Sequence, residues 1–354
     1  MILKIPQYPF FVKSALIILS LFLIVYVVII GKEILSPLLF AFIISILLLP
    51  IAKFFEKKLK IPRHFSALMC VLLFIASLFL LFFALGSQIE KLIQDWPLFK
   101  AQVMLSFDTL QVWIANKFHI DSNKQLDYLQ TNTRQLLTST PLIFGVTITS
   151  MSSMLIALIF TLLFTFFSLV YRGLALKFLI SIVHNHQTHV VYDIIIEVQL
   201  IIRKYVVGLF TEMVIVATTV CTAFYFLGIK YAILLGIITG LFNLIPYVGI
   251  TTALLLSMLI TFATTGLFFK VFLVALVIVL THLIDANVLL PLVVGSKLKI
   301  NAFAAVIGVL LGEMIWGVAG MFLAILVIAI FKIIFDRIDG LKPLGLLLGE
   351  EERN

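Results

Sequence analysis

Three acidic residues lie inside apolar stretches of this chain, where a charged group is costly. Glu212, Asp285 and Glu313 each interrupt a run of aliphatic and aromatic residues. A carboxylate in hydrocarbon pairs, takes up a proton or binds a cation, so each is a candidate for ion or solute binding. His282 and Asn287 add polar groups beside Asp285, and His282 could pair with it at a spacing of i, i+3. The alternative for each carboxylate is a structural hydrogen bond between helices.

Two long apolar segments, 231–262 and 303–335, indicate where a solute could bind. Each is about 32 residues long, which is too long for one simple span, and each loses its apolar character near the middle. The segments superpose at an offset of 72 residues. Interrupted hydrophobic segments at corresponding positions point to a transporter's binding site. The superposed glycines form two GxxxG pairs, which permit close helix packing: Gly236 with Gly240, and Gly308 with Gly312.

A proline accounts for the first break. Pro246 lacks a backbone donor and disrupts the preceding helical turn, so nearby carbonyl groups need other partners. Irregular backbone at membrane depth is tolerated only against protein or a wet cavity. We therefore expect this break to offer polar groups to a small hydrophilic solute, with a plain proline kink as the alternative. The polar groups of the first break are Asn243, Tyr247 and the backbone of Gly249, and the second break holds Glu313, Gly317 and Gly320.

The composition is that of an integral membrane protein. Hydrophobic residues make up 63% of the chain and charged residues 12%, with a mean hydropathy of +1.23. Soluble domains average about half apolar and about a quarter charged residues, and they lack apolar runs of about 20. We predict an all-α, polytopic helical membrane protein. Besides the broken segments, its apolar runs are 11–30, 34–52, 65–86, 142–170, 205–227 and 271–290.

Basic residues predict the orientation of these spans. Short loops rich in Lys and Arg remain in the cytoplasm, and the stretches 53–63 and 172–204 are such loops. We therefore place the N-terminus and both stretches in the cytoplasm. The excess positive charge behind the net charge of +8 lies on these loops, so it does not indicate a nucleic-acid partner.

Two topologies of the C-terminal half remain open. If both broken segments are re-entrant hairpins, the protein has six full spans, and the units 205–262 and 271–335 form an inverted repeat. If each segment is one kinked span, the protein has eight spans. The hairpins place Lys297 and Lys299 in the cytoplasm, so the positive-inside rule favours them. The expected parts are a three-span scaffold (1–87), an extracytoplasmic helical insertion (88–140), a fourth span with a cytoplasmic amphipathic helix (141–204) and a transport core (205–345).

Motifs of soluble-type enzymes are missing from the sequence. It contains no Walker loop, no HExxH, no GxSxG and no Gly-rich nucleotide-binding turn. His184, His186 and His189 lack the spacing and companion ligands of a zinc site. We expect no enzymatic activity, no metal site and no cofactor other than a coupling H⁺ or Na⁺.

Several motifs in 203–345 together resemble the autoinducer-2 exporter family. They are RKYVVG (203–208), IPYVG (245–249), DANVLLPLVVG (285–295) and the glycine-rich stretch 312–320. The resemblance implies a carrier of the bacterial inner membrane that forms a homo-oligomer, with a pentamer as one form. It also implies export of the signal autoinducer-2 in some members and exchange of Na⁺ for H⁺ in others.

These observations lead to a prediction of function. We expect a secondary transporter, embedded in the lipid bilayer, that exports a small hydrophilic solute such as autoinducer-2 by alternating access around a midplane site. A Na⁺/H⁺ antiporter that uses Asp285 and Glu313 is one alternative. A membrane scaffold or regulator that works through residues 88–140 is an alternative of another class.

Overall fold

The protein folds into helices throughout the part of the chain that the structure describes. The computed structural model describes residues 9–97, 140–182, 188–245, 248–289 and 300–350, with a few isolated positions besides. These residues form eleven α-helices and no sheet. The helices are α1 (Phe10–Ile30), α2 (Lys32–Lys57), α3 (Arg63–Gln94), α6 (Thr140–Ser181), α7 (Thr188–Phe226), α8 (Ala232–Asn243), α9 (Val248–Thr265), α10 (Phe268–Ile284), α12 (Ala302–Trp316), α13 (Val318–Arg337) and α14 (Lys342–Leu348). A π-helical turn, η2 (Asp285–Leu289), extends α10.

Eight of the described helices are long and apolar enough to cross a membrane, which confirms the prediction of an all-helical, multi-pass membrane protein. They are α1, α2, α3, α6, α7, α9, α10 with η2, and α13. The helices α8 and α12 are apolar but shorter. Both long segments noted in the sequence are therefore divided into a short and a long helix, at residues 244–247 and at Gly317.

All three boundaries between the expected parts fall inside helices, the one at 140/141 between the first two residues of α6. The boundary at 87/88 lies within α3, and the boundary at 204/205 lies within α7. The polar residues around 203 carry no proline, so α7 continues from the expected amphipathic helix into the apolar span without a break. Most of the expected insertion 88–140 lies outside the described residues.

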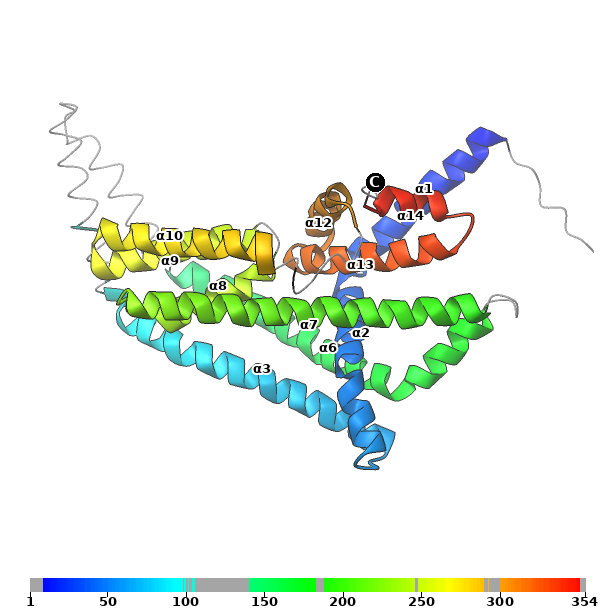
Figure 1. Cartoon of the computed structure of the whole chain (residues 1–354), viewed down its shortest axis with the longest axis horizontal. Helices are drawn as coiled ribbons and strands as arrows, with labels where there is room; N and C mark the ends of the chain where they lie inside the picture. Colours follow the sequence, from blue (N-terminus) through cyan, green and yellow to red (C-terminus); the bar gives the residue numbers. More distant parts are fainter. Residues whose placement is uncertain are drawn as a thin grey trace, which may run out of the picture.

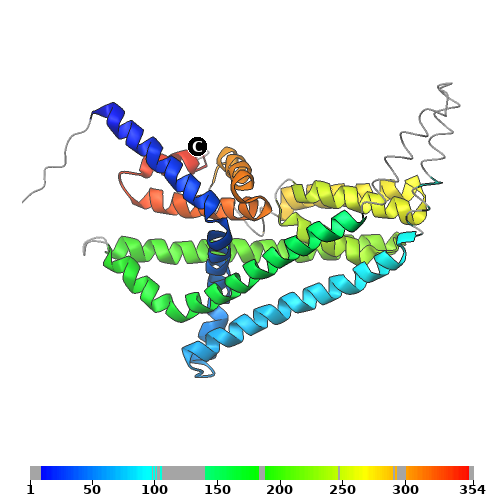
Figure 2. The same cartoon turned by 180° about the vertical axis from the view of Figure 1, so that it is seen from behind.

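The long helix α7 organises the packing. Its buried residues recur every three or four positions from Val198 to Phe224, so one face is covered along its length. The half before Leu209 packs in an apolar cluster with α13, and the half after Val216 packs in a second cluster with α8, α9 and α10. Figure 1 shows these two groups of helices side by side along α7, with α3 and α6 on its other side. In Figure 2, seen from behind, α2 crosses α7 rather than running along it.

The chain reverses direction between α8 and α9. The turns before α8 and after α9 contain Gly228 and Gly266, both at a φ of +64° that favours glycine. Lys270 at the start of α10 donates to the carbonyl oxygen of Gly228 at 3.2 Å, which joins these two turns. Lys230 lies 2.5 Å from Asp95 at the end of α3 and holds the pKa of that carboxyl below its usual range. The pair α8–α9 therefore starts and ends at one end of the molecule, beside the end of α3.

The pair α12–α13 is also an antiparallel hairpin. Gly317 forms its turn at a φ of +64°. Gly312 and Gly320 then pack backbone against backbone, because a Cβ atom on Gly320 would lie 1.9 Å from the carbonyl oxygen of Gly312. Gly308 lies one turn further along and faces Ile328. In both contacts, a residue further back from the turn on α12 meets one further on from it on α13, as in two antiparallel helices in close contact.

Candidate functional site

The site is built around Glu212, which lies on the buried face of α7. It stands between Leu209 of the first apolar cluster and Val216 of the second, and only 3% of its surface is exposed. Its spacing of three residues from Leu209 and four from Val216 places it in the same stripe as these apolar residues. A carboxylate in this position is removed from water at the boundary between the two groups of helices.

Two helix ends bring polar groups to Glu212. The helix α8 stops at Asn243, three residues before Pro246, which cannot continue a helix at that point. The helix α10 changes into the π-helical turn η2 at Asp285, whose side chain is buried with 5% exposure. π-helical turns are rare and often occur at functional sites.

One side-chain amide joins the two carboxylates. Nδ2 of Asn243 donates to Oε1 of Glu212 at 2.9 Å and to Oδ2 of Asp285 at 3.0 Å. We call these three residues the carboxylate–amide cluster. It joins the middle of α7, the end of α8 and the end of α10, which are separated by 31 and 42 residues along the chain.

The cluster has unused capacity to bind a cation or a proton. Oε2 of Glu212 and Oδ1 of Asp285 are buried and have no hydrogen-bond partner. Two carboxylates that share one donor in a low-dielectric environment repel each other unless a proton or a cation compensates their charge. Among the described residues, no three His, Cys, Asp or Glu side chains come together as a metal site.

The structure brings some of the predicted site residues together and leaves others apart. Asn243 and Asp285 meet in the cluster. His282 does not bond to Asp285, since Asp285 accepts from Asn243 and Nδ1 of His282 is buried without a partner. Asn287 is exposed and donates to the Leu283 carbonyl oxygen at 2.7 Å within the helix, so it stays outside the cluster.

The second break lies apart from the cluster. Glu313 is exposed on α12, and none of the hydrogen bonds or ion pairs of the described residues joins it to Asp285 or Asn243. Apolar residues beside the two breaks do share neighbours. Leu244 and Ile315 both pack against the group of buried apolar residues that contains Trp316. Pro246 and Tyr247 lie outside the described residues.

The predicted glycines make close contacts between helix pairs. Gly236 and Gly240 face Cys221 and Ala217 of α7, where a Cβ atom would lie 2.3 to 2.7 Å from these residues. Gly308 and Gly312 face α13 instead. The two GxxxG pairs thus hold the short helices against different neighbours, the first against the preceding helix and the second against the following one.

Gly249 has a steric role at the first break. A Cβ atom on Gly249 would lie 1.7 Å from the carbonyl oxygen of Phe242, the residue before Asn243. Its N–H donates to the carbonyl oxygen of Ile245 at 3.1 Å. The glycine therefore lets the start of α9 approach the end of α8, which positions Asn243.

The site expected at the two breaks does not include Glu212, although its carboxylate is one of the candidates that the sequence offers. It was one of three carboxylates noted in apolar runs, but it lies far from both breaks in the sequence. The signal was its position in the apolar stripe of α7, where neighbours at three- and four-residue spacing are all apolar. A charged residue on the buried face needs a partner from another helix.

Comparison with known proteins shows one family over most of the chain. Residues 16–340 match the family described as AI-2E family transporter. The chain is 26% identical to YueF of Bacillus subtilis over 317 residues, which is 84% of this chain and 82% of YueF. It is 22% identical to YhhT of Escherichia coli K12 over 331 residues, 90% of this chain and 89% of YhhT. The names of both relatives designate candidate transport proteins.

Proposed function

Because this chain belongs to the AI-2E family of transporters, we propose that it is an ion-coupled secondary transporter with the carboxylate–amide cluster as its coupling site. The observation that carries this proposal is one half-buried amide shared by the buried carboxylates of Glu212 and Asp285, with one unpartnered oxygen left on each carboxylate. The transported solute is a small hydrophilic molecule, such as autoinducer-2, and the direction is export.

The cluster suits coupling because its charge changes with occupancy. With a proton or Na⁺ bound, the two carboxylates carry less net charge and can pass through a low-dielectric part of the protein at lower cost. Without the ion, they repel each other and favour exposure to water. An ion gradient can then bias the two orientations of an alternating-access cycle, since a ligand shifts an equilibrium by its difference in affinity for the two states.

We also propose that α8–α9 and α12–α13 enter the membrane as opposed re-entrant hairpins. The contact of Lys270 with Gly228 supports the first hairpin, because it joins the two ends of that segment. For the second, the side chain of Asn301 donates to the carbonyl oxygens of Leu347 and Gly349, which ties the start of α12 to the end of α14. The resulting halves would form an inverted repeat around the midplane, with the N-terminus in the cytoplasm of a bacterial cell.

In this arrangement the solute lies between the two hairpin tips. Asn243, Pro246 and Tyr247 belong to the first tip, and Glu313 is near the second, beside Gly317 and Gly320. The helices α1 and α2 form a scaffold and the contact between copies of a homo-oligomer. The observation that supports this role is that none of the described side chains of α1 is buried within the chain.

A Na⁺/H⁺ antiporter is a second candidate, which the paired carboxylates also favour. It differs in its cargo, because the ions alone would cross the membrane. If Glu313 contributes to that exchange as the sequence suggested, Glu313→Gln lowers it as strongly as a change in the cluster does. If the cluster acts alone, Glu313→Gln has a much smaller effect.

Flux measurements on the reconstituted protein test the proposal. We expect proteoliposomes loaded with autoinducer-2 to release it faster when a pH or Na⁺ gradient is imposed than when none is present. A gradient that drives ²²Na⁺ or proton movement without any solute would instead assign the protein as an antiporter. No gradient-dependent flux of solute or ions would contradict the proposed transport.

Cysteine accessibility tests the two hairpins. In a protein with Cys70 and Cys221 replaced by alanine, we expect Lys230→Cys and Lys270→Cys to react with an impermeant thiol reagent from outside intact cells. We expect Lys297→Cys to react only after the cells are opened, because both ends of the second hairpin lie in the cytoplasm. Reaction of Lys297→Cys from outside would favour eight full spans and contradict the inverted repeat.

A further inference from the structure

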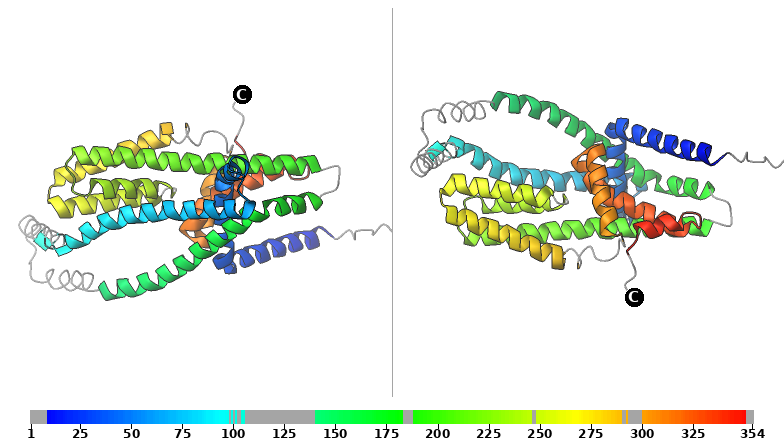
Figure 3. Two further views of the ribbon diagram at one scale, coloured as in Figure 1. Left: turned by 90° about the horizontal axis from the view of Figure 1, so that it is seen from below. Right: turned by 90° about the horizontal axis from the view of Figure 1, so that it is seen from above.

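A cavity of about 250 Å³ lies between α2 and α7, and its lining residues do not include those of the carboxylate–amide cluster. Arg203, at one edge of the cavity, precedes Glu212 by nine residues, which is about 13 Å along a helix. Figure 3 views the molecule along α2 and shows α7 passing beside it. The two sites are therefore separate.

The walls of the cavity are apolar and come from one face of each helix. Ile46, Leu49 and Pro50 of α2 line one wall, and Ile196 and Leu200 of α7 line the other. Their spacing of three and four residues places each set on a single helical face. Ile196 and Leu200 are each about half exposed, so the cavity is open to the surroundings of the protein. Residues 196–203 belong to the amphipathic stretch that the sequence places on the cytoplasmic side, and such a stretch lies at the membrane surface, so the opening faces the lipid headgroups.

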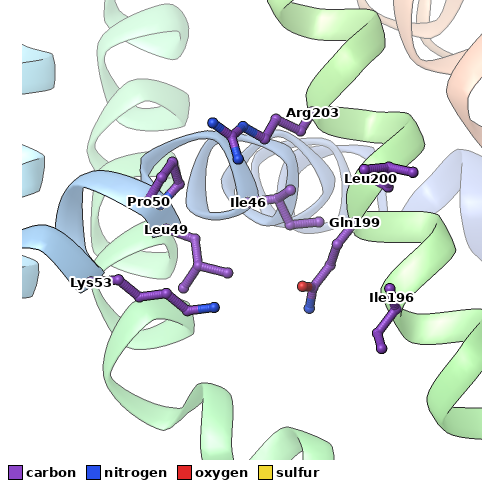
Figure 4. Close-up of a pocket in the computed structure, with 8 residues that line it drawn as sticks. All are labelled: Ile46, Leu49, Pro50, Lys53, Ile196, Gln199, Leu200 and Arg203. Atoms are coloured by element: carbon purple, nitrogen blue, oxygen red, sulfur yellow. The ribbon is translucent and has the colours of Figure 1, made fainter.

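Polar groups lie at the edge of the apolar walls. Lys53 follows Leu49 by one turn on α2, and Arg203 follows Leu200 by three residues on α7. In Figure 4 the side chains of Lys53 and Gln199 point toward each other across the cavity, and Arg203 lies at its other edge. The cavity thus combines two cations and an amide donor with apolar walls.

The two cations are free to bind an anion. Neither Lys53 nor Arg203 forms an ion pair among the described residues. The nearby acids are already neutralised, since Glu56 pairs with Arg172 and Glu197 pairs with Arg337. Long lysine and arginine side chains can keep their charged ends at the level of the lipid headgroups, and basic pockets between spans bind anionic lipid headgroups.

We propose that this cavity binds one anionic phospholipid. Its phosphate lies between Lys53 and Arg203, where Gln199 donates a further hydrogen bond, and an acyl chain lies against Ile46 and Leu49 on the membrane side of Lys53. The lipid comes from the leaflet that faces residues 53–63, which is the cytoplasmic leaflet in the orientation proposed above. A free phosphate would use the cations but would leave the apolar walls unoccupied.

Native mass spectrometry of the purified full-length protein tests the proposal, with phosphatidylglycerol, phosphatidylcholine and inorganic phosphate as probes. We expect phosphatidylglycerol to bind more tightly than phosphatidylcholine. Lys53→Gln/Arg203→Gln should weaken phosphatidylglycerol binding by about 30-fold, which corresponds to about 1 kcal/mol for each cation near a headgroup. The matched control Lys57→Gln/Lys204→Gln removes the same charge from neighbouring exposed residues that do not line the cavity, and it should bind as the wild type does.

The apolar walls provide the second variant. Leu200→Trp keeps both cations but fills part of the cavity, so it should also weaken phosphatidylglycerol binding. Equal binding by the wild type and Lys53→Gln/Arg203→Gln would overturn the site, as would an equal loss in the control double variant. Undiminished binding by Leu200→Trp, or displacement of the lipid by inorganic phosphate at similar concentration, would overturn the assignment to a lipid.

Discussion

Asp285→Asn is expected to abolish ion-coupled transport while leaving the protein folded. The amide is nearly isosteric, and its oxygen can still accept the hydrogen bond from Asn243 that Oδ2 accepts in the wild type. The neutral amide of asparagine cannot take up a proton in this pH range, and it has no negative charge to balance a bound cation. A charged hydrogen-bonding partner contributes up to about 3 kcal/mol, so gradient-driven flux should fall by about 100-fold. The measurement is solute efflux from proteoliposomes with and without an imposed gradient.

A surface acid provides the control for this variant. Asp336→Asn removes a carboxylate near the end of α13 whose partner is Lys332, and it should leave flux unchanged. Glu212→Gln should resemble Asp285→Asn, and the double variant should be little worse than either single one because both residues share Asn243. Wild-type flux from a correctly assembled Asp285→Asn protein would eliminate the cluster as the coupling site.

Gly249→Ala is expected to damage both stability and transport. The new Cβ atom would lie 1.7 Å from a backbone oxygen, that of Phe242, so no side-chain rotation can relieve the clash. The end of α8 must shift away from α9, and Asn243 shifts with it. Overpacking costs about 1 to 3 kcal/mol, which exceeds the gain in helix propensity of at most about 1 kcal/mol.

Thermal denaturation in detergent and efflux from proteoliposomes measure the two effects. We expect the Tm of Gly249→Ala to fall by several degrees and its gradient-driven flux to fall at least about tenfold, because the cluster loses its shared donor. Gly86→Ala is the matched control, since a Cβ atom on Gly86 in α3 meets nothing within 4 Å. An unchanged Tm and flux in Gly249→Ala would show that the close approach of α8 and α9 is not required.

Membrane insertion and helix type could be predicted from the sequence because they depend on local properties. An apolar run of about 20 residues must satisfy its backbone hydrogen bonds internally, and a helix does so without reference to the rest of the chain. The breaks were also local, since proline at 246 and glycine at 317 end helices by their own backbone chemistry. Lysine, arginine and glutamine have good helix propensity and no proline or glycine stands at 87/88 or 204/205, so α3 and α7 continue through these positions.

The partners of the buried carboxylates depended on the tertiary structure. The sequence identified Glu212, Asp285 and Glu313 as costly charges in apolar runs, but it did not distinguish which of these side chains is buried and which is exposed. The expected pair of His282 with Asp285 followed from helical spacing, whereas the observed donor comes from Asn243 on another helix. A contact across 42 residues is decided by how α7, α8 and α10 pack, and local spacing carries no information about it.

The sequence by itself thus determined the class of protein, the helices and the positions where their backbone breaks, because hydropathy and backbone chemistry act over a few residues. The tertiary structure decided which charges meet. Close packing at Gly236, Gly240 and Gly249 brings the end of α8 against α7 and α9, and only there can one amide reach both Glu212 and Asp285. Glu313, which looked equivalent in the sequence, lies exposed on α12 because the glycines of that helix face α13 instead.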